Sequence, residues 1–318
     1  MSVLITGGAG FIGSHLAERL VSGGVETVVF DDFSTGSEHN FSDFVGKHSL
    51  RLVRGDVRNP RALKDCLNGI DTVVHLAGIT SVSRSIQNPQ ECADINVGGT
   101  SNILRMSAAS GVSRFVYASS SAVYGNTNTI PISEDHPLEA VSPYAASKIS
   151  GEDLCRAYDG TNDMETVCLR LFNVYGPKQS NNGYANVIGN FLERINLSSP
   201  PLIYGDGEQT RDFIHVRDVI DALTSVIQGH EARGTFNVGT GRRVTVNHLA
   251  ETILKLSHNR HQGLLHGPPR PGEVRHSEAN IDRLKDRFGF VPKIQLEQGL
   301  LEMLEDARLF RYYTSHDV

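Results

Sequence analysis

The chain has 318 residues, 39% of them hydrophobic and 21% charged, proportions typical of a globular protein that buries a sizeable core. These proportions exclude a disordered, fibrous or disulfide-scaffold protein, and no apolar run approaches the ~20 residues that span a bilayer. The net charge of −6 excludes a general attraction to nucleic acid or anionic membranes, so locally placed cations must bind any anionic ligand.

The first half of the chain alternates short β-branched runs with amphipathic stretches. We expect strands at Val3–Thr6, Thr27–Asp31, Leu50–Arg54, Thr72–Leu76, Phe115–Ser119 and Thr166–Leu171. Helices are expected at His15–Ser22, Arg61–Asn68, Asn96–Ala109 and Tyr144–Tyr158. Strands that alternate with helices predict an α/β fold with a doubly wound parallel sheet (Rossmann), whose ligands bind at the carboxyl ends of the strands.

The character of the sequence changes after about Gly176, where shorter helices and loops rich in Gly, Pro and Asn follow. We therefore expect a dinucleotide-binding domain over residues 1–175 and a smaller α/β substrate lobe over 176–318. Some segments of the second part are expected to return to the first domain.

The cysteines and histidines predict neither disulfides nor a metal site. No metal-ligand spacing is found among Cys66, Cys92, Cys155 and Cys168, and no cysteine or carboxylate cluster accompanies His258, His261 and His266. The chain also begins without a signal-peptide pattern. We expect reduced thiols and a cytoplasmic location.

A glycine-rich loop joins the first expected strand to the first helix. The spacing of Gly7, Gly10 and Gly13 allows a tight turn, close approach of the backbone to a pyrophosphate, and close packing of helix on strand. The pyrophosphate would lie at the positive N-terminus of the helix. Asp31 ends the second strand 18 residues after Gly13, where a carboxylate accepts hydrogen bonds from the adenosine ribose.

Acidic residues near this loop favour one form of the dinucleotide. Asp31 and Asp32 repel a 2′-phosphate, and we expect no nearby arginine to compensate them, so NAD is favoured over NADP. Asp56 follows the third expected strand, where it either faces the adenine or caps the next helix.

Tyr144 and Lys148 form a candidate catalytic pair. Residues four apart share a helix face, which brings the ammonium close to the phenol. A phenol has a pKa of about 10, and the ammonium together with the positive nicotinamide of NAD⁺ favours the phenolate. Tyr144 is therefore expected to act as a base near neutral pH. A serine-rich strand end, Ser119–Ser121, lies about twenty residues before this helix.

Several segments resemble one protein family over nearly the whole chain. They are TGGAGFIGS (6–14), HLAG (75–78), NVG (96–98), SSSAVYG (119–125), SPYAASK (142–148), RLFNVYG (170–176), GDG (205–207), TRDFIHV (210–216) and RPGE (270–273). The chain resembles the nucleotide-sugar epimerase/dehydratase branch of the extended short-chain dehydrogenase/reductases, in particular its UDP-hexose 4-epimerases.

The resemblance implies roles for particular residues. Tyr144 would be the base, Lys148 its partner and the anchor of the nicotinamide ribose, and Ser120 the hydrogen-bond partner of the sugar 4-hydroxyl. NAD would be held by Gly7, Gly10, Phe11, Ile12, Gly13, Asp31, Asp32, Asp56, Val57, Leu76, Ala77, Gly78, Asn96, Ser119, Tyr144 and Lys148. The UDP-sugar would meet Ser81, Ser120, Ser121, Tyr144, Asn173, Asn186, Arg211, Arg270, Glu273 and Ser277. A homodimer is implied through helices near Asn96–Ala109 and Tyr144–Tyr158.

Two positions after Ser120 separate the reactions of this family. The dehydratases of the family that this chain resembles have an Asp-Glu pair at these positions, and its decarboxylases have Glu at the second one. This chain has Ser121 and Ala122 instead. The sequence thus favours NAD-dependent 4-epimerisation of UDP-glucose and UDP-galactose. UDP-glucuronate 4-epimerisation, or another modification of a nucleotide sugar, is the alternative. Intact Ser120, Tyr144 and Lys148 argue against a dinucleotide sensor without catalysis.

Ser277 bears on substrate size. It stands at the family's gate position, where a bulky tyrosine crowds the sugar C2 substituent in enzymes restricted to glucose and galactose. A serine leaves room for an N-acetyl group, with Ser81 as a neighbour. UDP-GlcNAc and UDP-GalNAc are therefore further expected substrates.

Overall fold

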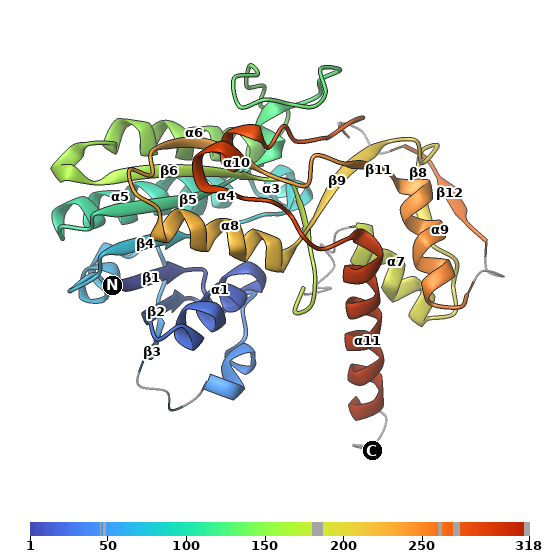
Figure 1. Cartoon of the computed structure of the whole chain (residues 1–318), viewed down its shortest axis with the longest axis horizontal. Helices are drawn as coiled ribbons and strands as arrows, with labels where there is room; N and C mark the ends of the chain where they lie inside the picture. The colour runs from blue at the N-terminus through green and yellow to red at the C-terminus, as the bar shows by residue number, and fades with distance from the viewer. Residues whose placement is uncertain (45, 47–48, 180–186, 260–262, 270–273, 315–318) are drawn as a thin grey trace.

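The computed structural model describes residues 1–44, 46, 49–179, 187–259, 263–269 and 274–314, without the side chains of 306–314. Its largest element is a parallel sheet of seven strands in the order β10-β6-β5-β4-β1-β2-β3 (Figure 1). The strands are β1 (Ser2–Thr6), β2 (Glu26–Asp31), β3 (Leu50–Arg54), β4 (Thr72–His75), β5 (Arg114–Ser120), β6 (Glu165–Leu171) and β10 (Gly234–Val238). The predicted doubly wound α/β fold is confirmed, and six of these strands were expected to within one residue at each end.

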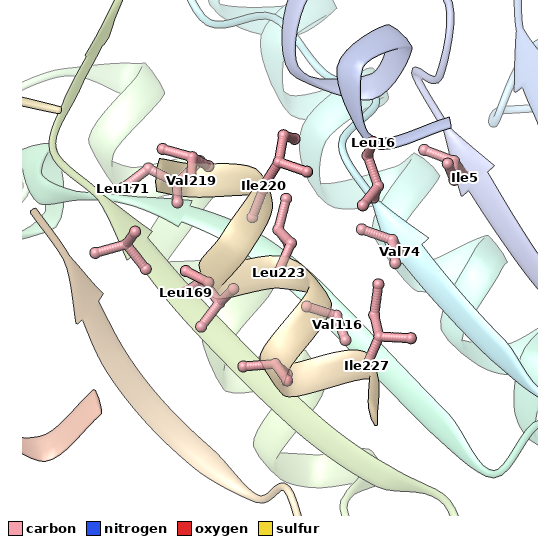
Figure 2. Close-up of a cluster of buried hydrophobic side chains, with 14 of the residues drawn as sticks. Ile5, Leu16, Val74, Val116, Leu169, Leu171, Val219, Ile220, Leu223 and Ile227 are labelled. Atoms are coloured by element: carbon pink, nitrogen blue, oxygen red, sulfur yellow. The ribbon is translucent and has the colours of Figure 1, made fainter. Parts of the chain in front are cut away.

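Helices cover both faces of this sheet. Ile5, Val74 and Val116 are paired across neighbouring strands and point toward α1 (Phe11–Ser22) and α8 (Val216–Gln228) (Figure 2). Leu4, Val73 and Phe115, their neighbours along each strand, point to the opposite face. That face is covered by α2 (Pro60–Cys66), α5 (Thr100–Ala109) and α6 (Pro143–Tyr158). Strands buried on both faces explain the uninterrupted apolar runs in the sequence.

Short helices complete this half of the molecule. They are η1 (Glu38–Phe44), α3 (Val82–Gln87), α4 (Pro89–Ala93), η2 (Asp94–Gly99), η3 (Ser121–Tyr124) and η4 (Thr161–Asp163). The helix expected over Asn96–Ala109 is divided, because a π-helical turn, η2, precedes α5.

A second lobe contains two small sheets. One has three strands in the order β11-β9-β7, namely β7 (Asn173–Tyr175), β9 (Thr210–His215) and β11 (Arg243–Thr245). The other pairs β8 (Leu202–Tyr204) with β12 (Leu265–Gly267). Their core includes Phe191, Leu249 and Leu300, from α7 (Val187–Asn196), α9 (Val246–Leu256) and α11 (Leu296–Thr314).

The chain passes between the two lobes several times. β10 pairs with β6 at the edge of the seven-stranded sheet, and α8 packs on one face of that sheet beside α1. Helix α10 (Asp282–Phe288) contacts both β10 and α8. These three elements all follow residue 175, the position at which the sequence suggested a division into domains.

Three chemical properties of the chain bear on the earlier expectations. All four cysteines are buried free thiols. Within the ranges described above, no group of three or more metal-binding side chains occurs. Those ranges also contain no helix that is both long and apolar enough to cross a membrane.

Candidate active site

The glycine-rich loop lies between β1 and α1, at the carboxyl end of the sheet. Gly7 has a φ of +67°, and a Cβ on it would lie 2.6 Å from the backbone nitrogen of Ala77. A Cβ on Gly13 would overlap the carbonyl oxygen of Gly7. Gly10 precedes α1 without a side-chain cap, so the first backbone N–H groups of the helix, at Phe11 and Ile12, lack an intrahelical acceptor. This is a cradle for an anion.

Asp31 fixes the shape of the loop. Its Oδ2 accepts a hydrogen bond from the Ala9 N–H at 2.9 Å, and its Oδ1 accepts one from the Phe33 N–H at 2.8 Å. Burial raises the pKa of Asp31, while the two N–H groups lower it. Each oxygen keeps a second lone pair for a ribose hydroxyl. The loop-shaping contacts were not foreseen from the sequence.

The expectation that no arginine lies near Asp31 and Asp32 is wrong. Arg54 stands opposite Asp31 in the register of β2 and β3, which brings together residues far apart in sequence. Its guanidinium pairs with Glu38 at 3.2 Å and lies 4.6 Å from the centre of the Phe33 ring. Arg54 is thus already engaged, but it partly offsets the negative charge at this end of the sheet.

Asp56 and Val57 follow β3. The Asp56 carboxylate pairs with Arg58, which lowers the pKa of that carboxyl, and the Arg58 charge also acts on Asp32. The alternative that Asp56 caps α2 is wrong, because Asn59 caps it by accepting from the Arg61 N–H at 3.1 Å. Val57 is buried in the core on the α5 side.

The turn after β4 contains Leu76, Ala77 and Gly78, and Asn96 supports it from behind. Asn96 Oδ1 accepts from the Ile79 N–H at 2.7 Å, and a Cβ on Gly78 would lie 2.8 Å from that oxygen. Asn96 Nδ2 donates to the Ile79 carbonyl and to Ser147 Oγ, both at 2.9 Å. Asn96 therefore ties this turn to α6.

The catalytic candidates meet where β5 ends and α6 begins. Ser142 caps α6 by accepting from the Ala145 N–H at 3.1 Å, which starts the helix just before Tyr144. Tyr144 and Lys148 are buried, and the Lys148 Nζ lies 5.9 Å from the centre of the Tyr144 ring. The Ser120 hydroxyl hydrogen-bonds the Tyr144 side chain. The three residues are thus brought together.

The protonation states of this pair are governed first by burial. Burial raises the pKa of Tyr144, and the hydrogen bond from Ser120 lowers it in part. Burial also lowers the pKa of Lys148 to about 8. The expected lowering of the phenol pKa by Lys148 is not found in the chain itself: burial raises that pKa, and Lys148 Nζ donates to the Ala118 carbonyl at 2.8 Å. The positive nicotinamide of a bound NAD⁺ would favour the phenolate.

Three candidate substrate residues lie on adjacent segments of the second lobe. Asn173 begins β7, which pairs with β9, and β9 carries Arg211. The Thr210 N–H donates to the Arg275 carbonyl at 3.0 Å, which places the segment before Ser277 beside β9. The side chain of Ser277 is buried.

The other substrate candidates are placed differently. Ser81 caps α3 by accepting from the Arg84 N–H at 3.1 Å, and Ser121 begins η3 directly after Ser120. Three candidates, Asn186, Arg270 and Glu273, lie outside the described residues.

Two buried polar groups had no role in the sequence analysis. His75 shares hydrogen bonds with Thr6 Oγ1 at 2.6 Å and Thr100 Oγ1 at 2.9 Å, and burial lowers its pKa to about 3. Glu152 pairs with Arg170 behind Ser119. The sequence held a signal for Glu152, which extends the spacing of Tyr144 and Lys148 by another four residues.

The anion cradle lies at the end of β1 and the tyrosine–lysine pair beside β5, two strands away at the same edge of the sheet. This arrangement defines a dinucleotide-dependent enzyme of the short-chain dehydrogenase/reductase class. The model of the NAD dependent epimerase/dehydratase family matches residues 3–239. The chain belongs to that family.

Relatives within the family carry out different reactions. UDP-glucose 4-epimerase of Mycolicibacterium smegmatis is 34% identical over 317 residues, covering 97% of this chain and 99% of its own. The structure of UDP-N-acetylglucosamine 4-epimerase from Methanobrevibacter ruminantium, in complex with UDP-N-acetylmuramic acid, superposes with a TM-score of 0.92 at 32% identity, covering 97% and 98%. The structure of MoeE5 in complex with UDP-glucuronic acid and NAD superposes with a TM-score of 0.88 at 34% sequence identity. The match covers 98% of this chain and 100% of the MoeE5 chain. Nucleotide-sugar decarboxylases and a dehydratase match at 31–33% identity.

The cofactor is NAD, which the MoeE5 complex contains. The residues of this chain fit it: the loop admits no side chain at Gly7 or Gly13, and the N-terminus of α1 is uncapped. Asp31 stands at the end of the neighbouring strand with lone pairs for a ribose.

Proposed function

We propose that the protein is a NAD-dependent 4-epimerase of UDP-hexoses, interconverting UDP-glucose and UDP-galactose. One observation carries the proposal: the Ser120–Tyr144 pair is followed by Ser121 and Ala122 in the turn η3. Elimination of water from the sugar needs an acid and a second base at these positions, as the resemblance to dehydratases implies. A hydroxyl and a methyl group provide neither.

Epimerisation needs one base and a reversible hydride acceptor. Bound NAD⁺ supplies the acceptor for the hydride of sugar C4. Tyr144 takes the proton of the 4-hydroxyl on its phenol oxygen and later returns it, while Ser120 holds the same hydroxyl. Lys148 stabilises the phenolate with its ammonium. Because Tyr144 and Lys148 are both buried, water is kept from the reacting oxygen.

The substrate lobe would hold the nucleotide. Arg211 offers a guanidinium suited to a diphosphate, and Asn173 lies on the neighbouring strand of the same sheet. By resemblance, Arg270 would add a second cation, Asn186 would lie near the nucleotide, and Glu273 would accept from the uridine ribose.

A conversion assay tests the proposed reaction. Purified protein should carry NAD and convert UDP-galactose to UDP-glucose without added reductant. The same panel should include UDP-GlcNAc, UDP-GalNAc and UDP-glucuronate, scored for inversion at C4 and for release of CO₂. Inversion of UDP-glucuronate alone would favour the alternative that the MoeE5 complex suggests. A persistent 4-keto product or released CO₂ would contradict epimerisation.

We propose that N-acetylated UDP-hexoses are also substrates, because a small side chain, Ser277, stands at the gate position. The similarity to a UDP-N-acetylglucosamine 4-epimerase supports this. Ser277→Tyr should lower kcat/KM for UDP-GlcNAc at least tenfold while preserving UDP-galactose turnover, since a methylene-sized clash costs ~1–3 kcal/mol. The matched variant Ser277→Ala should leave both substrates within about threefold. Equal losses for both substrates in Ser277→Tyr would disprove the gate.

We further propose a cytoplasmic homodimer joined through α5 and α6. The four free cysteines support a reducing compartment. On α6, Ala146 and Ala157 are exposed on one face, where their small side chains would allow close approach of a second helix. Sedimentation equilibrium should show a dimer for the wild type and a monomer for Ala146→Arg. A monomeric wild type would refute the assembly.

A further inference from the structure

Three consecutive residues at the end of β5 are each contacted by a side chain of α6. The contacts are those of Ser120 with Tyr144, of the Ala118 carbonyl with Lys148, and of the Ser119 hydroxyl with Glu152. The three helix residues are four apart and share one face. The proposed reaction assigns chemical roles to Tyr144 and Lys148 but none to Glu152.

Arg170 of β6 holds both carboxylate oxygens of Glu152. Its Nε donates to Oε1 at 2.9 Å and its Nη2 to Oε2 at 2.7 Å. Its Nη1 donates to the Tyr124 hydroxyl and to the Glu134 carbonyl, both at 2.9 Å. A bidentate arginine gives the carboxylate one orientation. The Ser119 hydroxyl is therefore attached to a carboxylate that is itself fixed.

A second ion pair that involves a residue of β6 provides a comparison. Arg114 and Glu165 join the amino ends of β5 and β6 at 2.7 Å, and their side chains are 14% and 19% exposed. The side chains of Arg170, near the carboxyl end of β6, and of Glu152, on α6, are 6% and 4% exposed. Burying such a pair is often neutral for stability, because desolvation offsets the attraction. Of these two ion pairs, Arg170–Glu152 alone includes a residue of α6, the helix that carries Tyr144 and Lys148.

We propose that Glu152, held by Arg170, is a positioning residue of the catalytic centre: it fixes the end of β5, which presents the Ser120 hydroxyl to Tyr144 and the Ala118 carbonyl to Lys148. The inference rests on the proposed epimerase function. Glu152 touches neither the sugar nor the cofactor in this role and acts through Ser119 and the end of β5.

The surroundings of Lys148 give this positioning role a readout in pH. The titratable groups that face it are His75 of β4, Cys92 of α4, Tyr117 of β5, and Tyr144, Glu152 and Cys155 of α6. Burial lowers the pKa of Lys148 to about 8, and Cys92, Cys155 and Glu152, in that order of size, act in the opposite direction. A neutral side chain at position 152 should therefore lower the pKa of Lys148 further, so that the ammonium is lost at a lower pH.

The test compares Glu152→Gln with Glu165→Gln in the purified NAD-containing enzyme, using UDP-galactose. For Glu152→Gln we expect kcat to fall about 10–100-fold, with KM and NAD content within about threefold. The alkaline limb of the kcat–pH profile should move to lower pH. Glu165→Gln removes the carboxylate of the Arg114–Glu165 pair between β5 and β6, and it should keep kcat within about twofold and the alkaline limb in place.

Glu152→Asp keeps the charge with a shorter reach, and it replaces Glu152→Gln if that variant does not fold. It should lower kcat while its alkaline limb stays at the wild-type pH. The inference is overturned if Glu152→Gln matches Glu165→Gln in kcat and profile, or if Glu152→Asp shifts the limb. A wild type that does not epimerise any UDP-hexose refutes the proposed function and this inference together, whereas an active wild type with an indifferent Glu152 refutes only the latter.

Discussion

The cofactor half and the proposed substrate lobe are built by different structural means. In the cofactor half, backbone and buried groups at the ends of adjacent parallel strands form the site, as with Gly7, Asp31 and Lys148. In the substrate lobe, short strands and loops bring in side chains that water reaches, such as the Asp206–Arg275 pair, 57% and 46% exposed. Under the proposed function, the cofactor half carries the groups of the reaction, and replaceable side chains of the second lobe select the substrate.

Replacing the base gives the largest expected effect. Tyr144→Phe keeps the ring and its packing but removes the oxygen that exchanges the proton. We expect kcat to fall about 10³-fold, with NAD content unchanged, because general base catalysis contributes 10²–10⁴-fold. Single-turnover and steady-state assays measure the loss. A variant that retains a tenth of wild-type activity would show that another group is the base.

A methyl group in the glycine loop is expected to abolish cofactor retention. Gly7→Ala forces a side chain onto a φ of +67°, within 2.6 Å of the Ala77 nitrogen. The purified variant should retain less than about a tenth of the NAD and lose ~1–3 kcal/mol in free energy of unfolding.

Gly69→Ala is its matched control. Gly69 has a similar φ of +73°, but no atom lies within 4 Å of the added Cβ. This variant should lose ~1 kcal/mol from backbone strain and keep its NAD. Equal NAD contents in Gly7→Ala and Gly69→Ala would contradict the view that the backbone of the glycine loop forms the cofactor site.

Acid stability should depend on buried histidines. The pKa of His75 is lowered to about 3 in the folded protein, whereas the unfolded chain takes up that proton near pH 6.5. Stability is therefore complete above pH 6.5 and decreases as the pH falls toward 3, by up to about 1.4 kcal/mol per pH unit for one proton. His215, whose pKa is lowered to about 4, adds a second proton where α8 begins.

Guanidinium unfolding between pH 4 and 7 separates these contributions. In His75→Gln, the slope of the free energy of unfolding against pH should decrease by the equivalent of one proton. The contribution of His215 to that slope should remain. Parallel curves for this variant and the wild type would mean that His75 is charged in the folded protein.

The smallest effect is expected in the substrate lobe. Arg275 holds the pKa of Asp206 at about 2, and the two side chains form a bidentate pair at 2.7 and 2.9 Å. Because this pair is exposed, Asp206→Asn should raise KM for UDP-galactose only about two- to fivefold and leave kcat unchanged. Salt at 0.5 M should reduce the difference. A loss in kcat would place this pair with the catalytic groups and blur the contrast between the halves.

Local patterns predicted one part of this molecule well. Six strands and the glycine loop depend on neighbouring residues, and the helix that carries Tyr144 and Lys148 on one face depends on a spacing of four. Long-range packing was not predictable in this way. Arg54 lies beside Asp31 only because of the parallel register, and Arg170 meets Glu152 only because β6 and α6 pack together. A local pattern does not show which distant charges the sheet brings together.

A chain cut near residue 175 would expose β6. Without β10, that strand would become a sheet edge with unpaired backbone groups, and without α8, Val116 and Leu169 would face water. An edge strand of this kind promotes aggregation. The cofactor half is therefore not a fragment that could be expressed alone, and thermal unfolding of the whole chain should remove both halves in one transition.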